Sequence, residues 1–298
     1  MSKCSLCPRG CGAERDAGGI GFCGVPADPV AARAAPHFGE EPCISGERGS
    51  GAVFFAGCTL RCVFCQNYGL SRAKQGKEIT VSRLRDIFKE LRDQGVHNIN
   101  LVTASHFVPA VAEALSGLEL GIPVVWNSSG YETVETLKML EGLVQVYLPD
   151  LKYLDGALSA KLSAAPDYPE VAAAAVQEMF RQTGPFQMDE DGMLQRGVLI
   201  RHLILPGQTD NSKRVIDWVS GRFAPEDVLF SLMSQYTPRG DLRRFPELKR
   251  RVSPAENEEV YQHLMNSKIE NGFFQELEAA TTDMIPRFDG TGVIKEDT

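Results

Sequence analysis

Six short apolar runs, each followed by a helix-like pattern, are the feature of this sequence that most restricts its fold. The runs cover residues 52–57, 99–104, 123–128, 144–151, 198–205 and 228–236. Several are continuous and rich in β-branched or aromatic residues, which is typical of strands buried on both faces of a parallel sheet. Between them, apolar residues recur at helical spacing. Repeated β/α units of this kind predict right-handed crossovers, in either a doubly wound sheet or a full or partial β/α barrel.

The segments on either side of these units have a different character. Residues 1–48 are rich in Cys, Gly, Pro and Ala and have little periodicity, so we expect a loop-rich module whose folding depends on a bound metal. Residues 49–280 carry the β/α units, and the polar residues 281–298 are expected to form a flexible tail. Asp191 and Gly192, between apolar flanks, predict a small hairpin before the fifth strand.

Charge and cysteine content narrow the possible functions. Lys and Arg number 31 against 39 Asp and Glu, a net charge of −8, which argues against nucleic acid as a main partner. No apolar run approaches the roughly 18 residues of a membrane span, and the first residues do not look like a secretion signal. We therefore expect a cytoplasmic protein without a membrane partner. In that compartment, 8 cysteines indicate metal binding or catalysis rather than disulfides.

Three of these cysteines follow the first predicted strand directly. Cys58, Cys62 and Cys65 have the spacing C-x3-C-x2-C, and no cysteine follows them in the chain. Iron–sulfur cubanes usually have four cysteine ligands, so three would leave one iron open to an external ligand. The alternatives are a zinc site, which would require a fourth ligand, and simple buried thiols.

The triplet and several other segments resemble the radical SAM (S-adenosylmethionine) superfamily, and within it the PflX group, which is similar to pyruvate formate-lyase activating enzyme. The segments are CSLCPRGCGAER, HFGEEPCISGERGSGAVFFAGC, CVFCQNYGLS, NSSGYE, YLPDLKY and RHLILPG. The resemblance implies a partial (β/α)6 barrel and a [4Fe–4S] cluster on Cys58, Cys62 and Cys65, with SAM bound at the open iron. Phe64, before the last cysteine, is at the position that lies near the adenine in this family.

The resemblance also implies a reaction. A flavodoxin- or ferredoxin-like donor reduces the cluster, SAM is cleaved, and the 5′-deoxyadenosyl radical abstracts a hydrogen atom from the substrate. The name of the group suggests a protein glycyl residue as substrate. Activating enzymes, however, carry Gly-Gly-Glu after the second strand, where this chain has Thr103-Ala104-Ser105-His106. A small molecule or a peptide is therefore the alternative substrate, and a hydroxyl of Ser105 or Thr103 is expected to replace the missing glutamate.

Polar residues at two further strand ends are candidates for SAM binding. Asn127 and Ser129 follow the third strand, where the family contacts SAM, although a capped turn is the simpler explanation. Asp150 and Lys152 follow the fourth strand and point to the same side. Charges there are costly unless they are used or paired, so we expect a functional pair, with a structural ion pair as the alternative.

Arg201 and His202 lie inside the fifth apolar run. An arginine in such a strand needs an anionic partner, and the SAM carboxylate or Asp150 would serve. His202 is assigned either to SAM or to a hydrogen-bonded core position. Beyond the cluster, we assign no catalytic residue.

Four more cysteines open the chain. Cys4, Cys7, Cys11 and Cys23 have the spacing C-x2-C-x3-C-x11-C among many glycines. Four thiolates suggest a closed second site for zinc or for a further iron–sulfur cluster, with a slight preference for zinc. Two cysteine clusters on one chain also leave a different class of function open, that of a non-catalytic metal-binding adaptor.

Overall fold

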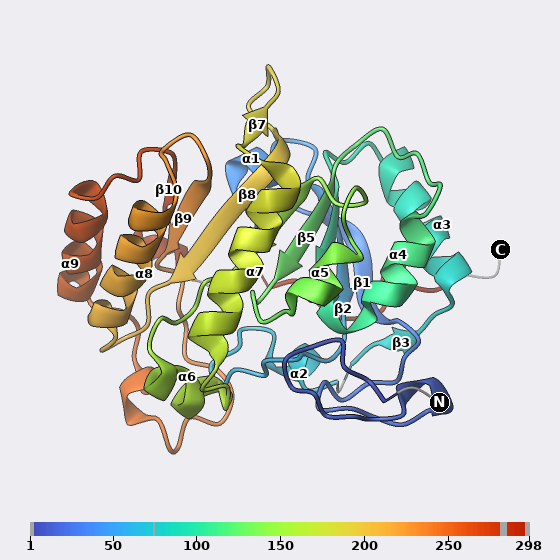
Figure 1. The fold of residues 1–298 in the computed structure, drawn as a ribbon, viewed down its shortest axis with the longest axis horizontal. Helices are drawn as coiled ribbons and strands as arrows, with labels where there is room; N and C mark the ends of the chain where they lie inside the picture. Colours follow the sequence, from blue (N-terminus) through green and yellow to red (C-terminus); the bar gives the residue numbers. More distant parts are fainter. Residues whose placement is uncertain (1–2, 74, 281–284, 296–298) are drawn as a thin grey trace.

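The fold is that of a computed structural model, which describes residues 3–73, 75–280 and 285–295. Its centre is a curved, mostly parallel sheet with helices on one side (Figure 1). The strand order is β10-β9-β8-β6-β5-β4-β2-β1-β3, and the short β7 pairs with β8. The strands are β1 Val30–His37, β2 Ser50–Phe55, β3 Lys77–Glu78, β4 Ile99–Val102, β5 Val124–Ser128, β6 Val146–Pro149, β7 Gln187–Met188, β8 Leu194–Leu203, β9 Leu229–Met233 and β10 Gly272–Phe274.

The six predicted strand runs correspond to β2, β4, β5, β6, β8 and β9. Each pairs with the next in parallel, which is the arrangement of a partial β/α barrel. The predicted hairpin is also present, because Gln187 of β7 pairs antiparallel with Arg196 of β8. The helices between the strands are α1 Pro42–Ser45, α2 Tyr68–Ser71, α3 Val81–Asp93, α4 Val108–Leu115, α5 Val134–Lys138, α6 Gly156–Ser163, α7 Tyr168–Thr183, α8 Thr209–Arg222 and α9 Pro254–Met265.

Helix α3 illustrates why these segments fold as they do. Its apolar stripe, which includes Leu84 and Phe88, is completely or almost completely buried. Thr80 caps the helix by accepting a hydrogen bond from Arg83 N, and Gly95 follows the end of the helix with a φ of 80°. The described helices include none that is long and apolar enough to cross a membrane.

The N-terminal module is shorter than the sequence predicted. Residues 30–37 form β1, which pairs antiparallel with β2 and so belongs to the sheet, although the predicted module extended to residue 48. Ahead of β1 the chain consists of loops and one 3-10 helix, Arg15–Ala17. Figure 1 shows this part below the sheet, on the side towards which the arrowheads of β5 and β8 point. The module therefore lies at the carboxyl ends of the parallel strands.

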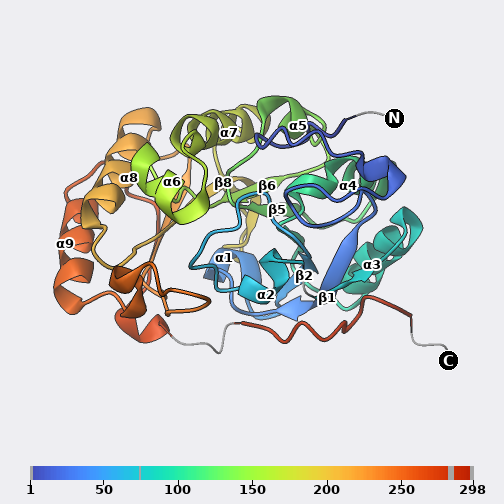
Figure 2. The same ribbon diagram turned by 90° about the horizontal axis from the view of Figure 1, so that it is seen from below.

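The described part of the C-terminal segment, residues 285–295, was expected to be flexible but is held against β1. Ala34 N donates to Thr291 O at 2.8 Å, and Gly290 N donates to Ala32 O at 2.9 Å. Val293 is completely buried. Figure 2 shows this segment running past β1 towards α3, where Arg83 Nε donates to Val293 O at 2.9 Å. Backbone pairing, which needs no apolar side chains, explains why a polar sequence is ordered here.

Candidate functional site

The cysteine triplet forms a loop directly after β2. Cys58 and Cys62 are buried and Cys65 is half-buried, and all three line the same pocket. Leu60 N and Arg61 N each donate to Cys58 Sγ at 3.4 Å. Arg61 has a φ of 55°, which turns the loop back on itself. Short spacing and this turn bring the three thiols to one side of the loop.

The surroundings of these thiols fit an iron–sulfur cluster. Burial raises the pKa of Cys58, and the charge of Cys62 raises it further. The pKa of Cys65 rises to about 12, through burial and then through the charges of Cys58 and Cys62. Without a cationic group the thiols stay protonated, and a positively charged group between them, such as the irons of a cluster, would favour the thiolates. The part of the chain that the structure describes contains no trio of His, Cys, Asp or Glu placed to hold a metal ion. A cluster binds each thiolate on a different iron, so its ligands need not converge as tightly.

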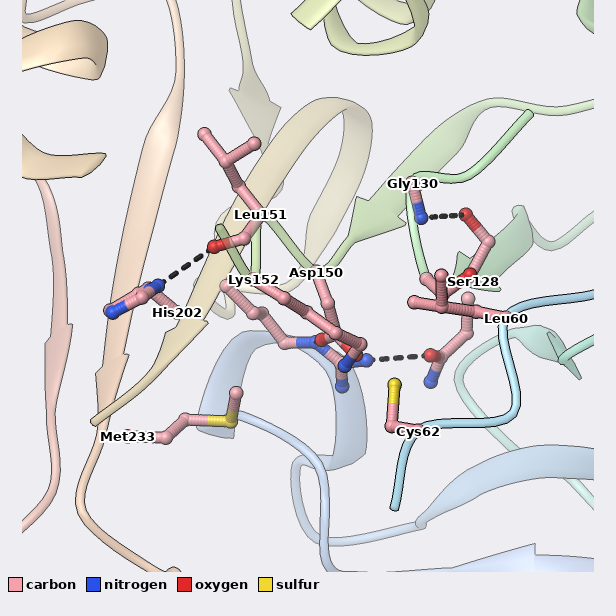
Figure 3. A network of polar contacts seen from close by, with 12 residues as sticks. Leu60, Cys62, Ser128, Gly130, Asp150, Leu151, Lys152, His202 and Met233 are labelled. Carbon is pink, nitrogen blue, oxygen red and sulfur yellow. Dashed lines mark hydrogen bonds and ion pairs between the residues drawn. The ribbon is translucent and has the colours of Figure 1, made fainter. Parts of the chain in front are cut away.

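The pocket beside the triplet lies at the carboxyl ends of the parallel strands. Of the predicted residues, Phe64, Asn127, Ser129, Asp150, Lys152 and Arg201 line it. They come from the cysteine loop and from the ends of β5, β6 and β8, which a parallel sheet brings to one edge. Figure 3 shows Asp150 and Lys152 near Cys62. The structure therefore brings together six of the eight residues predicted to contact SAM.

Arg201 is surrounded by protein acceptors. Its Nη1 donates to Glu40 Oε2 at 2.9 Å and its Nη2 to Asn127 Oδ1 at 2.6 Å. Its Nε lies 3.0 Å from Asp150 Oδ1, as an ion pair without the alignment of a hydrogen bond. All three nitrogens are thus engaged within the protein, which corresponds to the internal ion pair that the sequence left open.

Asp150 joins this arginine to Lys152. Lys152 Nζ lies 2.6 Å from Asp150 Oδ2. Burial alone would raise the pKa of Asp150, but the charges of Arg201 and Lys152 outweigh burial and lower it. Burial alone would lower the pKa of Lys152, but the negative charges of Asp150 and then Cys62 outweigh burial and raise it. Both side chains are therefore charged at neutral pH, and Lys152 provides a cation close to the thiols.

Glu40 is a pocket residue that the sequence did not reveal. It lies between β1 and α1 and accepts hydrogen bonds from Asn100 Nδ2 at 3.2 Å and Asn127 Nδ2 at 3.0 Å, besides that from Arg201. Glu40 thereby connects strands β4, β5 and β8 across the sheet. The sequence signals were its place in the segment HFGEEPCISGERGSGAVFFAGC, which resembles the family, and two consecutive acids flanked by Gly39 and Pro42, which are equally typical of an exposed loop.

Gly130 follows Ser129 and permits a close backbone approach. Its φ is 71°, and a Cβ at this position would lie 2.8 Å from Asp150 O. Its N–H donates to Ser128 Oγ at 3.2 Å. Only glycine therefore fits where the β5 and β6 ends meet.

Ser105 and His202 are not among the residues that line the pocket. Ser105 is buried and hydrogen-bonds to Glu132, and the neighbouring Thr103, with a φ of 64°, lines the pocket in its place. The backbone turns at Thr103, after the end of β4, and so Thr103 rather than Ser105 lines the pocket. Of the two hydroxyls that the sequence offered for the missing glutamate, only that of Thr103 belongs to a residue that lines the pocket.

His202 has two internal partners. Its Nδ1 lies 2.7 Å from Leu151 O, which can only accept (Figure 3). Its Nε2 lies 2.9 Å from Ser212 Oγ. Burial lowers its pKa to about 4, so the ring is neutral at pH 7 with its proton on Nδ1. His202 therefore occupies the core position that was its alternative.

The N-terminal cysteines lie next to the triplet loop. Cys58 N donates to Cys23 O at 3.2 Å. A Cβ on Gly21 would lie 3.2 Å from Cys11 Sγ and 3.5 Å from Cys23 Sγ, so these two sulfurs are on the same side of the module. Burial raises the pKa of Cys7 to about 11, and the charges of Cys23, Cys4 and Cys11 contribute. The four thiols are thus neighbours, but in the described residues no three are arranged to hold one metal ion.

Arg9 connects the module to the triplet loop. Its Nε donates to Thr59 O at 2.9 Å, and its Nη2 donates to Leu60 O at 3.2 Å and to Ser163 O at 2.8 Å. Its Nη1 donates to Ala164 O. One guanidinium thus joins the module, the triplet loop and the end of α6.

Comparisons with known proteins agree with this geometry. The family model of the radical SAM superfamily matches residues 52–219. The uncharacterized protein MJ0674 of Methanocaldococcus jannaschii is 29% identical over 271 residues, which cover 87% of this chain and 73% of the relative.

Two of the similar solved structures cover three quarters or more of this chain. Methylornithine synthase (PylB) has a TM-score of 0.49 at 15% identity and covers 81% of this chain and 70% of its own. SuiB of Streptococcus suis bound to S-adenosylmethionine has a TM-score of 0.44 at 15% identity and covers 75% of this chain, which spans 49% of SuiB. Since the family model spans more than half of the sequence, this chain belongs to the radical SAM superfamily.

Proposed function

We propose that Cys58, Cys62 and Cys65 hold a [4Fe–4S] cluster and that the adjoining pocket binds SAM. The observation that carries the proposal is the position of two buried thiols and one half-buried thiol beside a polar pocket at the strand ends. When bound, the cluster and SAM would supply the 5′-deoxyadenosyl radical that abstracts a hydrogen atom from the substrate. An external one-electron donor, of the flavodoxin or ferredoxin type, would be required.

The pocket residues have distinct roles in this proposal. Lys152 places a positive charge near the thiolates and offsets part of their repulsion. Phe64 provides an apolar surface for the adenine, and Asn127, Ser129 and Asp150 offer polar groups to the rest of SAM. Arg201 is a positioning residue, because its hydrogen bonds and ion pair fix Asn127 and Asp150.

The decisive experiment is anaerobic reconstitution with iron and sulfide, followed by reduction with dithionite in the presence of SAM. We expect about four irons on the triplet and the release of 5′-deoxyadenosine. Cys62→Ala should abolish this release. Its matched control is Cys43→Ala, because Cys43 is also buried but belongs to the smaller apolar cluster around Ile44. A fully loaded protein that releases no 5′-deoxyadenosine would contradict the proposal and support the adaptor instead.

For the substrate, we propose a protein glycyl residue, as in the PflX group that the sequence segments resemble. The missing Gly-Gly-Glu keeps a small molecule or a peptide as the alternative. A cell lysate labelled with deuterated glycine and separated by mass distinguishes them. Deuterium transferred to 5′-deoxyadenosine from the high-mass fraction would support the glycyl proposal. Transfer from the low-mass fraction alone would favour the alternative.

We also propose a second metal on Cys4, Cys7, Cys11 and Cys23, held as zinc or as a further cluster. Support comes from their mutual proximity and from the scarcity of secondary structure in the module. Metal analysis of anaerobically purified protein separates the two. About four irons with one zinc would support zinc, and about eight irons a second cluster. We further propose a cytoplasmic location without nucleic-acid or membrane partners, in line with the charge of −8.

A further inference from the structure

The end of helix α6 lies against the triplet loop and brings a hydroxyl to one of its sulfurs. Val63 N donates to Leu162 O at 2.9 Å, and Arg9 holds Ser163 O at 2.8 Å. Ala164 then adopts a φ of 50°, which ends the helix at this point. These contacts fix the backbone on both sides of Ser163. Its side chain donates to Cys62 Sγ at 3.1 Å, which is shorter than the backbone hydrogen bonds to Cys58 Sγ.

A second hydroxyl, that of Tyr153, lies next to the hydroxyl of Ser163. Tyr153 Oη lies 2.8 Å from Ser163 Oγ, and Tyr153 is completely buried. A serine hydroxyl carries a single hydrogen. Because Ser163 uses its hydrogen on Cys62, Tyr153 has to be the donor between the two. The order is therefore Tyr153 to Ser163 to Cys62 Sγ.

The tyrosine is fixed in place by aromatic neighbours. Its ring meets Phe64 edge to face at a centroid distance of 6.4 Å and Tyr168 at 5.2 Å. Since Ser163 and Tyr153 are both buried, this series of hydrogen bonds is shielded from water. Hydrogen bonds in series polarise one another, and a low dielectric strengthens them.

We infer that Ser163, supported by Tyr153, raises the reduction potential of the cluster through Cys62. This inference rests on the proposed function. Reduction adds one electron from an external one-electron reductant, and no covalent bond or proton changes place. The added charge is shared by the sulfurs, so a donor to Cys62 Sγ stabilises the reduced state more than the oxidised state. Hydrogen bonds to sulfur are among the factors that set such potentials.

The test is an EPR-monitored redox titration of the reconstituted full-length protein. In Ser163→Ala we expect the ratio of reduced to oxidised cluster at a given potential to fall about tenfold, equivalent to about 59 mV for one electron. Tyr153→Phe should change the ratio in the same direction by about threefold, since it weakens the bond without removing it. Ser163→Thr, which keeps the hydroxyl, should restore most of the wild-type potential.

Ser159→Ala is the matched control. Ser159 is a completely buried serine of the same helix, but its hydroxyl donates to Gly156 O at 3.1 Å. Its removal should leave the potential unchanged. A fully loaded Ser163→Ala protein with the wild-type potential would overturn the inference while the proposed function stands. If Ser163→Ala does not load, an unchanged potential in Tyr153→Phe would overturn it. A wild-type protein that binds no cluster would overturn the proposed function as well.

Discussion

Two groups of cysteines lie side by side in this protein, and they are organised in different ways. The triplet spans eight residues after β2, lines one pocket and has hydrogen bonds to the sulfurs of Cys58 and Cys62. The four N-terminal cysteines belong to a module of loops, and they range from exposed Cys11 to buried Cys23. The triplet is positioned by the sheet, whereas the module is attached to the triplet loop by Arg9. The position of the triplet therefore depends on the fold, whereas the arrangement of the module cysteines would depend on the metal that we propose there.

The strongest test of this difference is to remove one cysteine from each group. Cys62→Ala should lose the four-iron cluster and all 5′-deoxyadenosine formation, because the fold offers no replacement thiol there. Cys11→Ala should lose only the second metal and keep the iron of the triplet. Iron and zinc analysis with a SAM-cleavage assay provides the measurement. Equal loss of iron from both variants would mean that the groups form a single metal centre.

The contact between the two groups is tested at Gly57. Its φ is 82°, and a Cβ there would lie 2.6 Å from Cys23 O and 3.2 Å from His106 Nε2. Gly57→Ala should lower the free energy of unfolding by about 3 kcal/mol, through backbone strain and through the clash. Gly95→Ala is the control, since Gly95 has a φ of 80° and open space around it.

For Gly95→Ala we expect a loss of about 1 kcal/mol, because only the backbone strain applies. Denaturant titration of the metal-loaded proteins measures both values. Equal losses would show that the module exerts no steric constraint on the triplet loop.

Arg9 should matter less than Gly57 but more than an ordinary surface arginine. Arg9→Ala removes donors to four backbone carbonyls and should cost about 2 kcal/mol and slow cluster assembly. Arg9→Lys should recover only part of this, because an ammonium lacks the planar fork. Arg243→Ala, which breaks an exposed pair with Asp241, is the control and should cost almost nothing. An Arg9→Ala protein as stable as the control would mean that the module docks by other contacts.

Per pH unit, the smallest expected effect is a pH dependence at the contact between the groups. His106 lies 2.8 Å from Ala56 O through its Nε2, and Arg15 donates to its carbonyl at 2.7 Å. Burial lowers the pKa of His106 to about 3. Below about pH 6.5, this histidine is therefore protonated in the unfolded chain but stays neutral in the folded chain. The free energy of unfolding decreases from there towards pH 3. The loss from this group should be about 1 kcal/mol per pH unit.

Denaturant titrations between pH 7 and pH 5 test this expectation. His106→Gln should flatten the dependence, while Tyr68→Phe, away from the histidine, should leave it unchanged. A wild-type slope that persists in His106→Gln would assign the effect to other groups.

The sequence predicted the parts of this molecule that depend on short-range pattern. The six parallel strands followed from apolar periodicity, and the meeting of Asn127, Asp150 and Arg201 followed from the rule that parallel strands end at one edge. Pairings across long distances were not predictable in this way. Glu40 and Arg201 are 161 residues apart, and nothing local marks either as the partner of the other. At Thr103, a left-handed backbone turn reversed which hydroxyl faces the pocket.

Strand β1 was missed for a related reason. Its residues, VAARAAPH, have weak apolar contrast and a proline near the end. Pairing with β2 on one edge stabilises it regardless of side chains. For His202 the sequence left a SAM contact and a core position open, because both of its hydrogen-bond partners, Leu151 O and Ser212 Oγ, come from other segments.

The pairing of the C-terminal segment with β1 has a consequence for synthesis of the chain on the ribosome. Arg33 in β1 donates to Arg287 O, and these residues are 254 positions apart. At a synthesis rate of roughly 5–20 residues per second, the outer edge of β1 stays unpaired for roughly 10–50 seconds before its partner segment is made. An open strand edge is a template for pairing with other chains. Nascent chains of this protein should therefore depend on chaperone protection until the last segment emerges, and truncated chains should aggregate.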